Sequence, residues 1–221
     1  MTTLHATGTL PVSVIVICRD AAATLADTLD SIRAERPAQI IVAWTPTGPD
    51  DPSKAVLADY KDDVQVLEVT ESGIAVARNA GLSVARAPHI AWCDADDRWR
   101  PGKLTQQLAA LGDGTWVVSM IQKQGSGDRV MGFTPSAMLA KLAFVETVGP
   151  WDTRFHIAAD HDWMVRARRI AEARTMDCVL VDKGFDGRNA SANHLAYRRE
   201  LLRWARLQGQ SEVAHAESRS S

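Results

Sequence analysis

Four short apolar segments, separated by stretches with helical periodicity, constrain the fold of this chain more than any other feature. They occupy residues 12–18, 40–44, 64–69 and 89–93, and the first is almost entirely β-branched. Apolar segments of this length are typical of strands buried within a parallel sheet. Strands that alternate with helices at this spacing predict an α/β fold with a doubly wound, mostly parallel sheet. The intervening helices are predicted at residues 25–32, 52–60, 73–86 and 101–111.

The alternation becomes less regular beyond residue 120, so the second half is predicted to pack on the same sheet with a different connectivity. The polar residues 208–221 at the end of the chain are predicted to be a disordered tail. The elements predicted between the regular part and this tail are strands at 116–120 and 179–181 and helices at 136–148, 160–174 and 191–207.

Composition excludes several classes of protein. The 221 residues carry a formal net charge of −2 and contain no basic block, which argues against nucleic acid as a partner. Cys18, Cys93 and Cys178 form no CxxC pair, so we expect reduced cysteines in a cytoplasmic protein. The first residues lack the pattern of a signal peptide, and no apolar run approaches the roughly 20 residues that a transmembrane helix needs. The oligomeric state has no signature in the sequence.

Three carboxylates follow the predicted strand at 89–93, namely Asp94, Asp96 and Asp97. Ligands of open α/β sheets bind beyond the carboxyl ends of the strands. Acids crowded at such an edge repel one another unless a cation or a hydroxyl-rich ligand compensates them. Oxygen ligands suit Mg²⁺ or Mn²⁺, and an ion held by one or two carboxylates keeps coordination sites for a diphosphate. The alternative is an ordinary loop whose acids cap a helix or face water.

Arg78 lies on the predicted helix at 73–86, which carries small residues on one face. Small residues allow close packing on a sheet, and arginine recognises phosphate oxygens with two parallel hydrogen bonds. Arg78 is therefore a candidate for the phosphate site, and we expect it to serve the ligand rather than the fold. The alternative is an ordinary surface arginine.

Several segments together resemble the family 2 glycosyltransferases of the GT-A fold. The matching segments are Val-Ser-Val-Ile-Val at 12–16, Leu-Ala-Asp-Thr-Leu-Asp-Ser-Ile at 25–32, Ala-Arg-Asn-Ala-Gly-Leu at 77–82 and Ile-Ala-Trp-Cys-Asp-Ala-Asp-Asp at 90–97. The resemblance implies one GT-A domain at 10–207 with a Rossmann-like, mostly parallel sheet flanked by helices. Its halves would be a nucleotide-sugar-binding part at 10–120 and an acceptor-side part at 121–207.

The same resemblance implies an inverting glycosyltransferase that uses a nucleotide-sugar donor, Mn²⁺ or Mg²⁺, and an acceptor hydroxyl of unidentified nature. A UDP-sugar is the favoured donor, although the base is open. Asp94 would lie near the donor ribose and the metal, Asp96 would bind the metal, and Asp97 would support it. Arg78 would contact the phosphates or the base. A cation and an arginine would stabilise the charge that develops on the leaving nucleoside diphosphate.

The segment at 149–166 resembles the acceptor side of the family, where Asp160 aligns with the catalytic base. An acceptor hydroxyl is a poor nucleophile, and a positioned carboxylate can take its proton. Ala159 stands where the family usually has an acid, so Asp162 is a second candidate for the base. The alternative is that Asp160 only caps a helix and that Asp162 pairs with Arg166.

The sequence departs from the family after the strand at 40–44, where Trp-Thr-Pro-Thr-Gly replaces the usual Asp-Asp-Gly-Ser. Trp44 is a candidate to stack on the nucleobase, or else belongs to the core. Asp20, in the loop after the first strand, is a candidate to contact the base. The loop at 188–194 is a candidate to close over the donor. The lost acids leave a second hypothesis open, a catalytically degenerate member that only binds a nucleotide or a partner.

Overall fold

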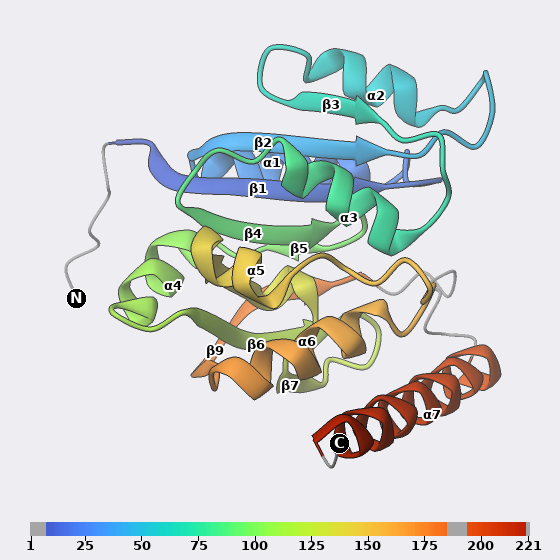
Figure 1. Cartoon of the computed structure of the whole chain (residues 1–221). Helices are drawn as coiled ribbons and strands as arrows, with labels where there is room; N and C mark the ends of the chain where they lie inside the picture. The colour runs from blue at the N-terminus through green and yellow to red at the C-terminus, as the bar shows by residue number, and fades with distance from the viewer. Residues whose placement is uncertain (1–7, 185–193, 220–221) are drawn as a thin grey trace.

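The computed structural model describes residues 8–184 and 194–219, and they form helices on both faces of one central sheet (Figure 1). The described strands are hydrogen-bonded in the order β3-β2-β1-β4-β8-β6-β9-β5, and β7 pairs with β6. The strands are β1 Leu10–Cys18, β2 Pro37–Trp44, β3 Gln65–Glu68, β4 His89–Asp94, β5 Arg98–Trp99, β6 Trp116–Lys123, β7 Arg129–Met131, β8 Met138–Lys141 and β9 Arg174–Lys183. The helices are α1 Leu25–Ala34, α2 Ser53–Asp59, α3 Ile74–Ser83, α4 Lys103–Leu111, η1 Pro135–Ala137, α5 Leu142–Val148, α6 Ala159–Ile170 and α7 His194–Arg219.

The first half confirms the predicted parallel α/β arrangement. β1 lies between β2 and β4, and both pairs are parallel, with Val14 opposite Ile40 on one side and Ala91 on the other. The side chains of β1 are buried because α1 and α4 cover one face of the sheet while α3, α5 and α6 cover the other (Figure 1). Because β1 and β4 are neighbours and run parallel, their carboxyl ends lie together at one end of the sheet, where this kind of fold is expected to bind ligands.

The predicted helix at 136–148 is wrong over its first part. Residues 135–137 form a single 3-10 turn, β8 follows at Met138–Lys141, and only Leu142–Val148 is α-helical. β8 is inserted antiparallel between β4 and β6, so the apolar side chains of Met138, Leu139 and Ala140 are buried by neighbouring strands. This pairing with distant residues overrides the local helical pattern and makes the sheet mixed.

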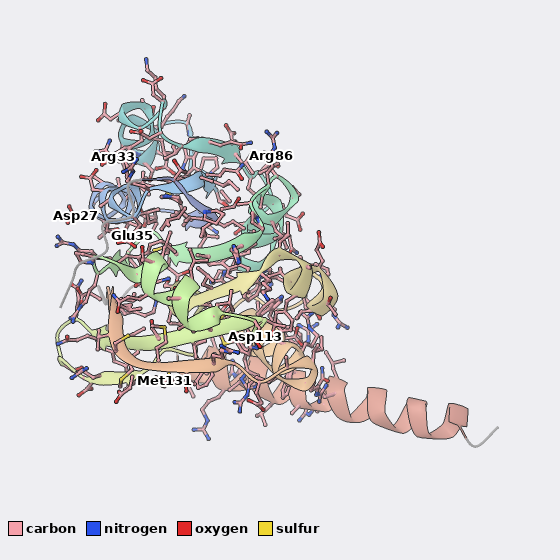
Figure 2. All side chains as sticks on the ribbon, turned by 90° about the vertical axis from the view of Figure 1, so that its left-hand side faces the viewer. Asp27, Arg33, Glu35, Arg86, Asp113 and Met131 are labelled. Carbon is pink, nitrogen blue, oxygen red and sulfur yellow. The ribbon has the colours of Figure 1, made fainter. Side chains whose placement is uncertain are left out.

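The end of the chain also differs from the prediction. α6 ends at Ile170, and β9 begins at Arg174, which had been assigned to the helix. α7 continues to Arg219, so residues 208–219 are helical where a disordered tail was predicted. This stretch contains no proline, and its alanine, glutamate and glutamine residues favour a helix. The last part of α7 extends away from the rest of the molecule (Figure 2).

Four tryptophans fix α6 against the sheet. Trp151 stacks on Trp163 with ring centroids 5.0 Å apart, and Trp92 of β4 packs against both rings, at 5.9 and 5.7 Å. Trp116 of β6 makes an edge contact with Trp163. These rings are buried and large, so the start of α6 is held at a defined place relative to the end of β4.

The described part of the chain contains no helix that is both long enough and apolar enough to cross a membrane.

Candidate active site

A cavity of about 1000 Å³ opens beyond the carboxyl ends of β1 and β4. The loop after β1, the start of α3 and the turn after β4 form one side, and the first turns of α6 form the other. Five of the predicted site residues line it, namely Asp20, Arg78, Asp94, Asp96 and Asp160. The fold therefore gathers residues that lie up to 140 positions apart in the sequence.

The turn after β4 brings Asp94, Asp96 and Asp97 together. One carboxylate oxygen from each lies within 4.8 Å of the others. Thr28 of α1 fixes the backbone of this turn, because its hydroxyl lies within hydrogen-bond distance, 2.9 Å, of the carbonyl oxygens of both Ala95 and Asp97. The carboxylates are thus directed by a fixed backbone, and all three supply oxygen ligands of the kind that Mg²⁺ and Mn²⁺ prefer.

Lys183, at the end of β9, is a site residue that the sequence did not reveal. Its ammonium nitrogen lies 3.0 Å from Asp94 Oδ2 and 2.8 Å from Asp97 Oδ2. Asp97 is fully buried and also accepts a hydrogen bond of 3.0 Å from the amide of Gly184. The sequence offers no reason to select Lys183, because a single lysine that follows a predicted strand is usually expected to face solvent. The antiparallel pairing of β9 with β5, in which Asp182 lies opposite Arg98, brings Lys183 to the turn at Asp94–Asp97, called the acid turn below.

These neighbours separate the pKa values of the three acids. Burial opposes ionisation of Asp94, but Lys183 and Arg78 outweigh it and lower its pKa to about 2. Burial raises the pKa of Asp97 despite Lys183. Burial, reinforced by the charge of Asp97, raises the pKa of Asp96 to about 7. Asp96 is outside the two Lys183 ion pairs, so a divalent cation beside it would favour its ionised form.

Arg78 connects the acid turn to α6. Its side chain is buried, its guanidinium donates to Asp94 Oδ1 at 3.2 Å, and it forms an ion pair with Asp160. The guanidinium carbon also lies 4.7 Å above the ring of Trp151. Arg78 was expected to serve the ligand rather than the fold. The structure instead makes it a buried link between two acids as well as part of the cavity wall.

Asp160 lies in the first turn of α6 and faces the cavity. Its side chain is 32% exposed, and burial of the rest raises its pKa against the lowering effect of Arg78. It is not the cap of α6, because the capping position belongs to Ala158. The carboxylate of Glu200 on α7 instead accepts hydrogen bonds from the amides of residues 156, 157 and 158, at 3.0, 2.7 and 2.8 Å. Glu200 carried no signal in the sequence.

Asp162 is turned away from the cavity. It is 3% exposed and accepts hydrogen bonds from Arg166 Nε at 2.9 Å and from Trp204 Nε1 at 3.0 Å. The predicted pairing with Arg166 is therefore present. Asp162 joins α6 to α7, and Asp160 is the acid of the two that can meet a ligand.

Trp44 is also placed away from the cavity. It is 7% exposed within the core, and its indole nitrogen donates to Asp51 Oδ2 at 3.3 Å. Asp51 also accepts from the amides of Thr47 and Ser53, at 2.9 and 2.8 Å. Burial opposes its ionisation, but these hydrogen bonds lower its pKa to about 2. This network organises the loop that departs from the family pattern.

Asp20 remains at the mouth of the cavity, with a positive φ of 50°. Of the loop predicted to close over the donor at 188–194, residues 188–193 lie outside the described residues.

The family model for glycosyl transferase family 2 matches residues 13–172. An uncharacterised glycosyltransferase of Bacillus subtilis, YwdF, is 24% identical over 220 residues, which cover 87% of this chain and 82% of that protein. The succinoglycan biosynthesis protein ExoU of Rhizobium meliloti is 31% identical over 144 residues. That match covers 61% of this chain and 42% of ExoU.

Solved structures share the fold. TarS 1–349 of S. aureus in complex with UDP-GlcNAc superposes with a TM-score of 0.67 at 13% identity, over 77% of this chain and 57% of that chain. The mannosyltransferase PcManGT of Pyrobaculum calidifontis, in complex with GDP-Man and Mn²⁺, gives 0.69 at 20% identity, over 89% and 63%. This chain therefore spans roughly three fifths of the length of either structure. The GT-A fold predicted from the sequence is confirmed.

Proposed function

The chain belongs to glycosyl transferase family 2, and from that premise we propose that it moves a sugar from a nucleotide-sugar donor to an acceptor hydroxyl with inversion. The observation that carries this proposal is the shared cavity. Asp160 faces the same space as the acid turn, and Arg78 ties the two together. Inversion needs a base and a leaving-group site on opposite sides of one reacting carbon. Asp160 would supply the base, and the acid turn would supply the leaving-group site.

The donor diphosphate would lie against the acid turn. Asp94, Asp96 and Asp97 would hold Mn²⁺ or Mg²⁺, which would supply positive charge to the diphosphate as it leaves. Asp96 offers the carboxylate that faces the cavity outside the lysine pairs. Arg78 would add hydrogen-bond donors near the phosphates while it keeps Asp94 ionised.

Asp160 would act as the base on the acceptor side. Its carboxylate would accept the proton of the acceptor hydroxyl as the new bond forms at the anomeric carbon. Its raised pKa makes it a better proton acceptor than an ordinary aspartate, and the ion pair with Arg78 orients it. Asp162, behind the helix, would support α6 without touching the substrate.

For the nucleotide we favour a UDP-sugar, with Asp20 near the base. Support comes from the cavity position of Asp20 and from the similarity to TarS, which is described in complex with UDP-GlcNAc. PcManGT is described with GDP-Man, so the panel that tests this choice must include both nucleotides. We further propose a cytoplasmic setting, which the three free cysteines support.

The proposal is tested with a panel of nucleotide sugars, with Mn²⁺ or with EDTA. Binding to the folded state raises the apparent melting temperature, so a true donor should stabilise the protein in Mn²⁺ and lose most of that effect in EDTA. Slow release of the nucleoside diphosphate from the same donor would indicate turnover. Stabilisation without any turnover, with every acceptor offered, would favour the degenerate nucleotide-binding module instead.

A further inference from the structure

The ammonium group of Lys183 lies between two carboxylates of the acid turn. It lies within 3.0 Å of carboxylate oxygens of both Asp94 and Asp97, the same residues that would hold the metal ion. Asp97 is fully buried, and the side chains of Lys183 and Asp94 are each 22% exposed. A buried carboxylate without a cation would be costly, so Lys183 balances the charge of Asp97 and, together with Arg78, that of Asp94.

The backbone holds Lys183 at this place. Gly184 donates its amide to Asp97 Oδ1 at 3.0 Å, and a Cβ at Gly184 would overlap the carbonyl oxygen of Asp96. The end of β9 is therefore pressed against the acid turn, and only glycine fits there. The long side chain of Lys183 lines the cavity, so its ammonium can turn toward a ligand while its backbone stays fixed.

We propose that Lys183 is a positioning residue that competes with the divalent cation for Asp94 and Asp97 and gives way only when the donor diphosphate arrives. A second cation cannot share these carboxylates with the ammonium without strong repulsion. The diphosphate supplies both the oxygens that complete the metal site and an anionic partner for the displaced ammonium. Metal and nucleotide would then bind with positive coupling. The inference rests on the proposed metal-dependent function.

The test measures Mn²⁺ affinity of the full chain by electron paramagnetic resonance, without nucleotide and with UDP. Wild-type protein should bind Mn²⁺ weakly alone and at least ten-fold more tightly with UDP. Lys183→Met should bind Mn²⁺ at least ten-fold more tightly than wild type without nucleotide, and the further strengthening by UDP should be smaller than in wild type, because only the oxygens of the diphosphate then contribute. Lys183→Arg keeps the cation and should behave like wild type. A merely structural lysine would leave the Mn²⁺–UDP coupling unchanged.

A second pair of variants keeps the test decisive if Lys183→Met does not fold. Asp97→Asn removes the most buried charge, so Lys183→Met/Asp97→Asn should fold and should bind Mn²⁺ at least ten-fold more tightly than Asp97→Asn alone. Equal or weaker Mn²⁺ binding after loss of Lys183, in either background, overturns the inference. Absence of Mn²⁺ binding to wild type even with UDP overturns the proposed metal dependence instead, so the two failures are distinguishable.

Discussion

The turn after β4 carries three carboxylates and the first turn of α6 carries two, yet their side chains are arranged in opposite ways. In the turn, Asp94, Asp96 and Asp97 point to one place, with oxygens within 4.8 Å. On α6, residues two apart are about 200° apart around the axis, so Asp160 faces the cavity while Asp162 faces α7. Backbone geometry, rather than acid content, therefore decides which carboxylates can act together on a ligand.

The largest effect is expected from Asp160→Asn. The substitution keeps the size of the side chain and a hydrogen-bond acceptor for Arg78, but it removes the proton acceptor. Turnover should fall by roughly 10²–10⁴, which is the usual contribution of a general base, while nucleotide binding persists. Single-turnover kinetics with radiolabelled donor would measure this. Turnover within two-fold of wild type would show that the base lies elsewhere.

Arg78→Met should have the next largest effect, on stability. It leaves Asp94 and Asp160 without the guanidinium that both contact, and it retains most of the packing on Trp151. We expect a loss of about 3 kcal/mol in the free energy of unfolding, at the lower end for a broken buried pair because both acids are partly exposed. Urea denaturation would measure it. An unchanged midpoint would mean that Arg78 serves the ligand alone.

Asp162→Asn separates the two acids of α6 most clearly. Asparagine still accepts from Trp204, but the charged pair with Arg166 is lost. The free energy of unfolding should fall by about 1.5–3 kcal/mol. Turnover per folded molecule should stay near that of wild type, in contrast to Asp160→Asn. A catalytically dead but stable Asp162→Asn would reverse the assignment of the two acids.

Glu200→Gln should have the smallest effect, because it only loosens the segment that precedes α6. Burial opposes ionisation of Glu200, but its hydrogen bonds with three amides lower its pKa. A lowered folded-state pKa stabilises the protein above the unfolded value of about 4.3, and this contribution is lost as the pH falls through the folded-state pKa. At pH 7 the free energy of unfolding of the variant should be about 1 kcal/mol lower than that of wild type. Melting curves should show the difference from wild type shrinking below about pH 4.

The sequence predicted the first half well because its signals are local. Period and length alone identified β1, β2 and β4, and the acids that follow β4 lie where that order of elements puts them. β8 was missed because its apolar residues owe their extended shape to pairing with β4 and β6. No local pattern reports that pairing.

The site was predicted in part for the same reason. Motif spacing identified four candidate site residues that the fold does gather around one cavity, namely Arg78, Asp94, Asp96 and Asp160. Lys183 was not predictable, because its partners lie 86 and 89 residues away and are set by the order of the sheet. The sequence left Trp44 open between stacking on the base and packing in the core, and the structure places it in the core, with a hydrogen bond to Asp51 that no local pattern reports.

The pH dependence of kcat/KM tests most directly the claim that Asp160 alone of the two α6 acids is the base. Burial raises the pKa of Asp160, so kcat/KM at saturating Mn²⁺ should rise with pH until this carboxylate ionises, with a midpoint above the ordinary aspartate value of about 3.9. This limb should vanish in Asp160→Asn and persist in Asp162→Asn. A limb that survives in Asp160→Asn, or disappears in Asp162→Asn, would contradict the account.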